Sequence, residues 1–261
     1  MMRLQDRIAL VTGSSRGIGA AIAKRLAADG ARVVLHARAS PEKAEQVAQT
    51  IRAAGGIADI VLGDLETGDA PARIVQEAFA IHGALDILVN NAGGGSGGRA
   101  VELDLERVDR MLSVNLRAVI LATAEFARLT TSPHGRVIVI SSGAAAHPAF
   151  GSSVYAAAKA GAEAFARSAA QELGERGITL NSIEPGPTIT DMLESSEGKE
   201  GRRWSDTAAR WAALRRLGRP DDIADIVAFL CSDEARWLTG TTIPANGGMV
   251  TTAANIIAYA S

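Results

Sequence analysis

The chain has 261 residues, of which 47% are hydrophobic, enough for a packed core in one large domain. Its formal net charge is -2, so no overall positive charge attracts nucleic acid or an anionic membrane. The N-terminus lacks the pattern of a signal peptide, and no segment reaches the roughly 18 apolar residues of a transmembrane helix. Cys231 is the single cysteine, so it has no second cysteine to pair with. We therefore expect a globular cytoplasmic protein that acts on a small molecule, with no nucleic-acid partner, no membrane partner and no metal.

Short apolar runs alternate with helical patterns along the whole chain, which is typical of β-α units that build a parallel sheet. The predicted strands are 7–12, 32–36, 58–62, 85–90, 136–141, 178–183 and 241–244. The predicted helices are 17–29, 41–54, 70–82, 105–130, 153–174 and 220–231. This pattern predicts an α/β fold of the doubly wound, Rossmann type, with about seven parallel strands, helices on both faces and a single domain over residues 1–261.

The connection between the first predicted strand and the first predicted helix reads TGSSRGIG. Its glycines, Gly13, Gly17 and Gly19, have G-x-x-x-G-x-G spacing. Glycines let the backbone approach a diphosphate closely, and the N–H groups that open the following helix favour its negative charge. We therefore predict that this loop, including Ser15 and Ile18, binds a dinucleotide.

The end of the second strand indicates which dinucleotide binds. An acidic residue there bonds the ribose 2′-hydroxyl of NAD, whereas basic residues accept the 2′-phosphate of NADP. Here the chain reads His36, Ala37 and Arg38, and Arg16 lies inside the glycine loop. Because guanidinium groups suit a phosphate dianion, NADP(H) is favoured over NAD(H), and His36, Arg38 and Arg16 are assigned to the cofactor site. Each arginine taken alone could equally be an ordinary surface charge.

Tyr155 and Lys159 stand four residues apart in the alanine-rich segment YAAAK. On a helix both side chains would lie on one face, about 5 to 6 Å apart at Cβ. A tyrosine has a usual pKa of about 10, so it acts as an acid or base near neutral pH only beside cationic groups. An isolated pair of this kind is also explained by an amphipathic helix whose tyrosine and lysine happen to be neighbours.

Together these motifs make the sequence similar to the short-chain dehydrogenase/reductase family, and in particular to its 3-oxoacyl reductase-like branch. The resemblance covers about residues 7–249 and is carried by TGSSRGIG, GDL (63–65), NNAG (90–93), SVNL (113–116), ISS (140–142), YAAAK (155–159), EPGPTITDM (184–192) and NGGM (246–249). It implies an oxidoreductase that interconverts a small carbonyl compound and the corresponding alcohol by hydride transfer, and a homotetramer.

The resemblance implies a catalytic role for four residues. Tyr155 would be the general acid/base, made acidic by Lys159 together with the positive nicotinamide ring of the oxidised cofactor. Lys159 would also bond the nicotinamide ribose, Ser142 would hold the substrate oxygen, and Asn115 would support a water relay to the lysine. Ser142 precedes Tyr155 by thirteen residues, a spacing similar to the family's, and neighbouring Ser141 is the competing choice. A locally satisfied helix amide is the alternative for Asn115.

The resemblance implies further cofactor contacts after three of the predicted strands. These residues are Asp64, Leu65, Asn91, Ala92, Gly93, Pro185, Gly186, Thr188 and Thr190. Asp64 would meet the adenine edge, although a plain strand-end aspartate is the alternative. Pro187 and Thr188 replace the commoner bulky apolar pair of the family, and the second proline removes a backbone donor there.

A substrate lid is predicted around residues 188–216, with Trp204 and Trp211 in a helical segment. The alternative is a solvated loop followed by an amphipathic helix that uses the two tryptophans in a core or subunit contact. Further pocket walls are expected from residues 94–99 and 143–153, the latter with His147 and Phe150.

The substrate is expected to be a free small carbonyl compound or alcohol. The fatty-acid branch of the family docks an acidic carrier protein on basic residues, whereas this chain has TSP at 131–133 and Gln171 at the matching positions. Two alternatives stay open: a 3-oxoacyl-thioester reductase of fatty-acid type, and a noncatalytic NADP(H)-binding regulator. The apolar segment 250–261 is expected to pack on a neighbouring subunit.

Overall fold

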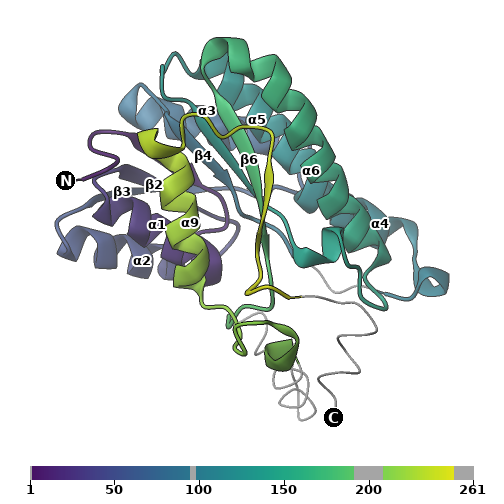
Figure 1. The fold of residues 1–261 in the computed structure, drawn as a ribbon. Coiled ribbons are helices and arrows are strands. Elements are labelled where there is room, and N and C mark those ends of the chain that lie inside the picture. The colour runs from purple at the N-terminus through teal and green to yellow at the C-terminus, as the bar shows by residue number, and fades with distance from the viewer. Residues whose placement is uncertain (1, 95–97, 191–207, 250–261) are drawn as a thin grey trace.

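The computed structural model describes residues 2–94, 98–190 and 208–249, in which seven parallel strands form one sheet (Figure 1). The strands are β1 (Ile8–Val11), β2 (Arg32–Ala37), β3 (Ile57–Leu62), β4 (Ile87–Asn90), β5 (Arg136–Ile140), β6 (Thr179–Pro185) and β7 (Thr242–Ala245). Their order is β3-β2-β1-β4-β5-β6-β7. All seven predicted strands are present, so the predicted Rossmann-type sheet is confirmed.

Helices cover both faces of the sheet (Figure 1). One face carries α1 (Gly17–Ala28), α2 (Pro41–Ala53) and α9 (Pro220–Cys231), and the other carries α3 (Ala70–His82), α5 (Ala118–Leu129) and α6 (Ser153–Leu173), with α4 (Leu105–Leu112) before α5. In β1, Ala9 and Val11 join the core under α1 and α9, whereas Ile8 and Leu10 join the core under α3 and α5. Because both faces are buried, the strands are continuous apolar runs in the sequence.

The helix predicted over 105–130 is present but contains a π-helical turn that the sequence did not indicate. α4 ends at Leu112, and a π-helical turn over Ser113–Arg117 precedes α5. The Asn115 Nδ2 donates to the Met111 carbonyl at 2.9 Å and to the Gly94 carbonyl at 3.0 Å. A side chain that engages a carbonyl of the preceding turn disturbs the regular helical hydrogen bonds, which accounts for the wider turn.

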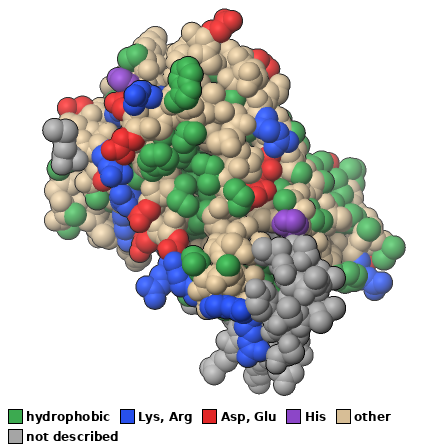
Figure 2. All heavy atoms as spheres, in the orientation of Figure 1, with side chains coloured by type: hydrophobic (Ala, Val, Ile, Leu, Met, Phe, Trp, Pro, Cys, Tyr) green, Lys and Arg blue, Asp and Glu red, His purple; other side chains and the backbone are tan. Residues whose placement is uncertain are grey.

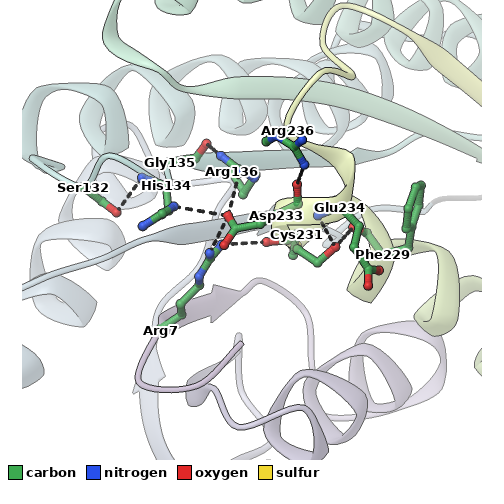
Figure 3. A network of polar contacts seen from close by, with 11 residues as sticks. Arg7, Ser132, His134, Gly135, Arg136, Phe229, Cys231, Asp233, Glu234 and Arg236 are labelled. Carbon is green, nitrogen blue, oxygen red and sulfur yellow. Dashed lines mark hydrogen bonds and ion pairs between the residues drawn. The ribbon is translucent and has the colours of Figure 1, made fainter. Parts of the chain in front are cut away.

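A cluster of charged side chains joins the amino ends of β1 and β5 to the end of α9 (Figure 3). Arg7 and Arg136 are both buried, and their guanidinium groups lie 2.7 and 3.5 Å from one carboxylate oxygen of Asp233. The His134 Nδ1 lies 3.2 Å from the same oxygen. Arg7 also donates to the carbonyl of Cys231, whose fully buried thiol has its pKa raised to about 12 by burial. Cys231 therefore belongs to the hydrophobic core.

β7 is an edge strand beside an apolar surface. Hydrophobic side chains gather between α9 and β7 on the face that Figure 2 shows. Near these elements Phe229, Leu238 and Trp237 are 37%, 38% and 95% exposed. Exposed apolar area next to an open sheet edge is typical of a surface that contacts another chain. Across the described part of the chain, no helix combines the length and apolarity that crossing a membrane requires.

Candidate active site

The glycine loop lies where the order of the strands reverses, between β1 and β4. Gly13 has φ +63°, and a Cβ there would lie 2.9 Å from the Ala92 Cα. A Cβ on Gly19 would lie 2.5 Å from the Gly13 carbonyl oxygen. Larger residues at either position would force the loop away from the sheet. The loop therefore exposes its backbone at the crevice where doubly wound sheets bind nucleotides.

The start of α1 suits a diphosphate. Arg16 precedes the helix and its side chain makes no capping hydrogen bond. The first N–H groups of a helix lack partners within it and carry a partial positive charge, which favours an anion. A hollow of about 590 Å³ adjoins this helix end, and its lining includes Ser15, Arg16, Gly17 and Thr190. The residues present thus fit the diphosphate of a dinucleotide.

His36 does not present its side chain to a ligand, which corrects its assignment as a cofactor contact. The ring is 2% exposed, its Nδ1 accepts from the Gly13 N–H at 3.1 Å, and its Nε2 lies 3.0 Å from the Gly63 carbonyl oxygen. Because Nδ1 is an acceptor, Nε2 carries the proton. Burial lowers the pKa of His36, which favours this neutral form. His36 therefore supports the glycine loop from within.

The two predicted phosphate-binding arginines are exposed. Arg16 lies on the glycine loop, and Arg38 follows β2 with its side chain 65% exposed. Arg38 Nη1 lies 3.4 Å from a carboxylate oxygen of Glu66, a solvent-accessible pair of the kind that contributes little stability. Both guanidinium groups are therefore accessible to a ligand.

Among the residues after β3 and β4, Leu65 is buried, whereas Asp64, Asn91 and Ala92 are half-buried. Asp64 is half-buried and accepts from the Glu66 N–H at 2.9 Å, whereas Leu65 is 6% exposed and packs in the core. Leu65 therefore offers a ligand its backbone and little of its side chain. Asn91 and Ala92 line the crevice beside the glycine loop, where the Asn91 Nδ2 donates to the Gly13 carbonyl at 3.1 Å.

Thr12 supports the candidate site from beneath, and the sequence prediction assigned it no role. Its hydroxyl oxygen accepts from the N–H groups of Asn91 and Ala92, at 2.9 and 3.0 Å, and donates to the Val89 carbonyl. One buried hydroxyl thereby joins the end of β1 to the segment after β4. The threonine that opens TGSSRGIG was the available signal, but only the fold shows what it contacts.

Tyr155 and Lys159 project from one face of α6, as predicted. The Lys159 Nζ lies 5.9 Å from the centroid of the Tyr155 ring and donates to the Ile140 carbonyl at 2.8 Å. Ser142 hydrogen-bonds the Tyr155 phenol, whereas the Ser141 hydroxyl donates to Glu163. The choice of Ser142 over Ser141 therefore agrees with the geometry.

Asn115 lies beside Lys159, and both side chains approach Gly93. A Cβ on Gly93 would lie 2.7 Å from the Asn115 Oδ1 and 2.9 Å from the Lys159 Nζ. The Asn115 Oδ1 also accepts from the Gly94 N–H at 3.0 Å. The Asn115 side chain is fully buried and its hydrogen bonds are satisfied locally, which agrees with the alternative of a locally satisfied helix amide. The same side chain also lies beside Lys159.

Lys159 alone does not make the phenol acidic. Burial raises the pKa of Tyr155, and the hydrogen bond with Ser142 lowers it by less. Burial also lowers the pKa of Lys159 to about 8, against an opposing effect of the Glu163 carboxylate. In the free protein the pKa of the Tyr155 phenol is therefore raised overall, even with Lys159 beside it.

The segment after β6 lies against the glycine loop. Pro185 pairs with Ala245 in the sheet, and a Cβ on Gly186 would lie 2.8 Å from the Asn246 Cα. The Thr188 hydroxyl donates to the Gly186 carbonyl at 2.9 Å. A Cβ on Gly17 would lie 3.4 Å from the Thr190 Cγ2, so Thr190 is close to the start of α1.

Parts of the predicted pocket and lid fall outside the described residues, namely 95–97 and 191–207, which include Trp204. The same is true of the expected subunit-contact segment 250–261. His147 and Phe150 are exposed, and Phe150 is 91% exposed.

Comparisons with known proteins agree with this geometry. The family model described as enoyl-(acyl carrier protein) reductase matches residues 13–250. The chain is 42% identical to the short-chain dehydrogenase/reductase FrzI of Cladobotryum sp, over 95% of this chain and 97% of the relative. The chain belongs to the short-chain dehydrogenase/reductase family. It is also 38% identical to the 3-oxoacyl-[acyl-carrier-protein] reductase FabG of Staphylococcus aureus, over 92% of this chain and 97% of that protein.

Solved structures of short-chain dehydrogenases share the fold. An enzyme of the family from Serratia marcescens is 39% identical, with a TM-score of 0.88 over 95% of this chain and 99% of that chain. A short-chain dehydrogenase from Burkholderia cenocepacia, solved in complex with NADP, is 42% identical, with the same TM-score and coverage. As a short-chain dehydrogenase/reductase, the protein is an NAD(P)-dependent oxidoreductase.

Proposed function

We propose that the protein uses NADP(H) to interconvert a small carbonyl compound and the corresponding alcohol, with Tyr155 as the general acid/base. The observation that carries this proposal is the convergence of Tyr155, Lys159, Ser142 and Asn115 at the carboxyl ends of β4 and β5, beside a loop that fits a diphosphate. Acid/base and hydride chemistry need these groups next to one another.

Each side chain has a separate task in the proposed reaction. The nicotinamide, when bound, supplies or accepts the hydride. Ser142 holds the substrate oxygen beside the phenol, and Tyr155 Oη donates a proton to that oxygen in reduction or accepts one in oxidation. Lys159 is anchored by the Ile140 carbonyl and favours the phenolate through its charge. Asn115 maintains the Gly94 loop next to the lysine.

The proposed preference for NADP(H) rests on Arg16 and Arg38. No carboxylate occupies the end of β2, where an NAD-specific site would hold the ribose 2′-hydroxyl. Two similar structures, the Burkholderia cenocepacia enzyme and a metagenomic blue fluorescent protein that is 34% identical, were solved with NADP and NADPH respectively. The remaining proposed cofactor contacts are Gly13, Ser15, Gly17, Ile18, Gly19, Asp64, Leu65, Asn91, Ala92, Gly93, Tyr155, Lys159, Pro185, Gly186, Thr188 and Thr190.

Tyr155→Phe tests the acid/base assignment. The variant keeps the ring and removes the hydroxyl, so NADPH oxidation with a panel of carbonyl compounds should be lost while NADPH binding, followed by fluorescence, is retained. Wild-type turnover in the variant would refute the assignment. Absence of wild-type turnover across a broad panel, with intact NADPH binding, would favour the noncatalytic regulator.

A 3-oxoacyl-thioester reductase is the second candidate, and the similarity to the Staphylococcus aureus FabG favours it. Against it, Thr131, Pro133 and Gln171 lie exposed where basic residues would dock a carrier protein. Reduction of a 3-oxoacyl group on acyl carrier protein at a much higher kcat/KM than the same group on a short thiol would support this candidate.

We also propose a homotetramer, to which the apolar surface between α9 and the edge strand β7 contributes one contact. Light scattering on the purified protein tests the state directly. A mass near the 27.0 kDa of one chain would remove this proposal.

A further inference from the structure

A short parallel bridge joins the segment after β6 to the segment just before α9. The Gly218 N–H donates to the Pro187 carbonyl at 2.9 Å, and the Ile189 N–H donates to the Gly218 carbonyl at 2.9 Å. Thr188 and Gly218 are thus paired in the way that residues of neighbouring parallel strands are. The bridge lies outside the seven-stranded sheet and connects two parts of the chain that are far apart in the sequence.

The bridge accounts for the proline pair in EPGPT. A proline at 187 removes a backbone donor, but the bridge uses only the carbonyl of Pro187 and takes its N–H group from Ile189. The fixed φ of the proline also stiffens the segment. Pro187 is therefore compatible with a rigid pairing at this place.

The backbone of Thr188 is turned away from Gly218. Gly218 bonds the residues on either side of Thr188, so the N–H and C=O groups of Thr188 itself point to the opposite edge of the segment. Neither group has a hydrogen-bond partner within the described ranges, although Thr188 is 7% exposed. The segment reaches the glycine loop at Thr190, which lies against Gly17. This donor and acceptor are therefore available to a ligand at the crevice.

Gly218 fits closely against the residues that it pairs with. A Cβ on Gly218 would lie 3.0 Å from the Thr188 Oγ1 and 3.4 Å from the Pro187 carbonyl oxygen. The Thr188 hydroxyl is itself fixed, because it donates to the Gly186 carbonyl at 2.9 Å. A side chain at 218 would therefore displace Thr188 or break this hydrogen bond.

One carboxylate at the start of α9 holds Gly218 from both sides. The Arg216 guanidinium donates to the two carboxylate oxygens of Asp222 at 2.6 and 2.8 Å, and the Arg219 N–H donates to one of them at 2.7 Å. Bidentate arginine pairs have a defined geometry. The hydrogen bonds from Arg216 lower the pKa of Asp222 to about 2, so the carboxylate is ionised at neutral pH. The bridge is thereby tied to α9.

We propose that Gly218 is a positioning residue for the cofactor: its bridge, anchored by Asp222, presents the N–H and C=O groups of Thr188 to the carboxamide of the nicotinamide. A carboxamide carries an adjacent donor and acceptor, which match those of one residue's backbone. The identity of the ligand rests on the proposed function, whereas the bridge does not. Gly218 and Asp222 act through Thr188, so they should affect only the nicotinamide half of the cofactor.

Two ligands separate the halves of the cofactor. NADPH carries the nicotinamide, whereas adenosine 2′,5′-bisphosphate carries only the adenosine half with its 2′-phosphate. Gly218→Ala and Asp222→Ala should each weaken NADPH binding by about threefold to tenfold, the effect of one lost neutral hydrogen bond, and leave bisphosphate binding unchanged in calorimetric titrations. The enhancement of nicotinamide fluorescence on binding should also decrease.

Two matched variants control for general effects of these substitutions. Gly68→Ala adds a Cβ with no atom within 4 Å. Asp225→Ala removes a carboxylate from the same helix as Asp222, but one that pairs with Arg25 on α1. Both variants should bind the two ligands as the wild type does, and thermal melting followed by circular dichroism shows whether each variant is folded.

A double variant tests whether Gly218 acts through Thr188. Thr188→Ala removes the hydroxyl that a Cβ at 218 would approach, so Gly218→Ala combined with Thr188→Ala should bind NADPH as Thr188→Ala alone does. Additive losses, unchanged NADPH binding in Gly218→Ala, or equal weakening of both ligands would overturn the inference. Should Gly218→Ala not fold, Asp222→Ala tests the same bridge with Gly218 intact. Wild-type protein that binds no NADPH would instead remove the proposed function itself.

Discussion

Arg38→Ala is expected to weaken NADPH binding while leaving NADH binding nearly unchanged. The guanidinium follows β2 directly and is proposed to bind the 2′-phosphate that only NADPH carries. A hydrogen bond to a charged group contributes about 1.5 to 3 kcal/mol. Because the side chain is 65% exposed and already pairs with Glu66 at 3.4 Å, the lower end applies, which corresponds to a loss of about tenfold in affinity.

The assay is fluorescence titration with NADPH and NADH at one fixed ionic strength, since salt screens exposed charges. Glu66→Gln provides a change of opposite sign, because it removes the carboxylate that competes for Arg38 and should strengthen NADPH binding slightly. Arg73→Ala is the matched control, an exposed arginine on α3 that pairs with Asp69. Equal weakening of NADPH and NADH by Arg38→Ala would refute the reasoning.

Three further predictions concern the scaffold. Gly19→Ala places a Cβ 2.5 Å from the Gly13 carbonyl oxygen and should reduce the affinity for either dinucleotide by at least about tenfold. Fluorescence titration measures this affinity, and an unchanged value would mean that the loop adapts to the Cβ. Asp233→Asn removes the carboxylate charge that the buried Arg7 and Arg136 share, and should lower the free energy of unfolding by about 1 to 3 kcal/mol. An unchanged midpoint of urea unfolding would contradict this. The pKa of His36 is lowered below its usual 6.5 in the folded protein, so as the pH falls below about 6.5 the unfolded chain takes up a proton that the folded protein does not, and the free energy of unfolding should decrease. His36→Gln should reduce this pH dependence, and an unaltered profile would exclude the histidine as its cause.

The sheet was predictable because its strands are buried on both faces and their apolar runs contrast with the helical patterns between them. The glycine loop was predictable for a related reason: its place between the first strand and the first helix fixes where it lies in the fold. Tyr155 and Lys159 needed only helical geometry to bring them together.

Other features depend on contacts that no local pattern encodes. The segment SVNLR has ordinary helical residues, and its π-helical turn follows from bonds between Asn115 and a distant loop. His36 looked accessible at a strand end, but the glycine loop and the strand beside it engage both ring nitrogens. Ser141 and Glu163 lie on different elements, so only the packing of α6 on the sheet shows that the serine hydroxyl donates to the glutamate.

The central claim is that the Tyr155 phenol becomes acidic when positive charge is added beside it. The chain has two tyrosines, so the variant Tyr259→Phe leaves Tyr155 as the single phenol for an ultraviolet titration. In the free protein burial should hold the pKa of Tyr155 above its usual 10, and saturation with NADP+ should lower it well below that value. A pKa that stays raised with NADP+ bound would contradict the account.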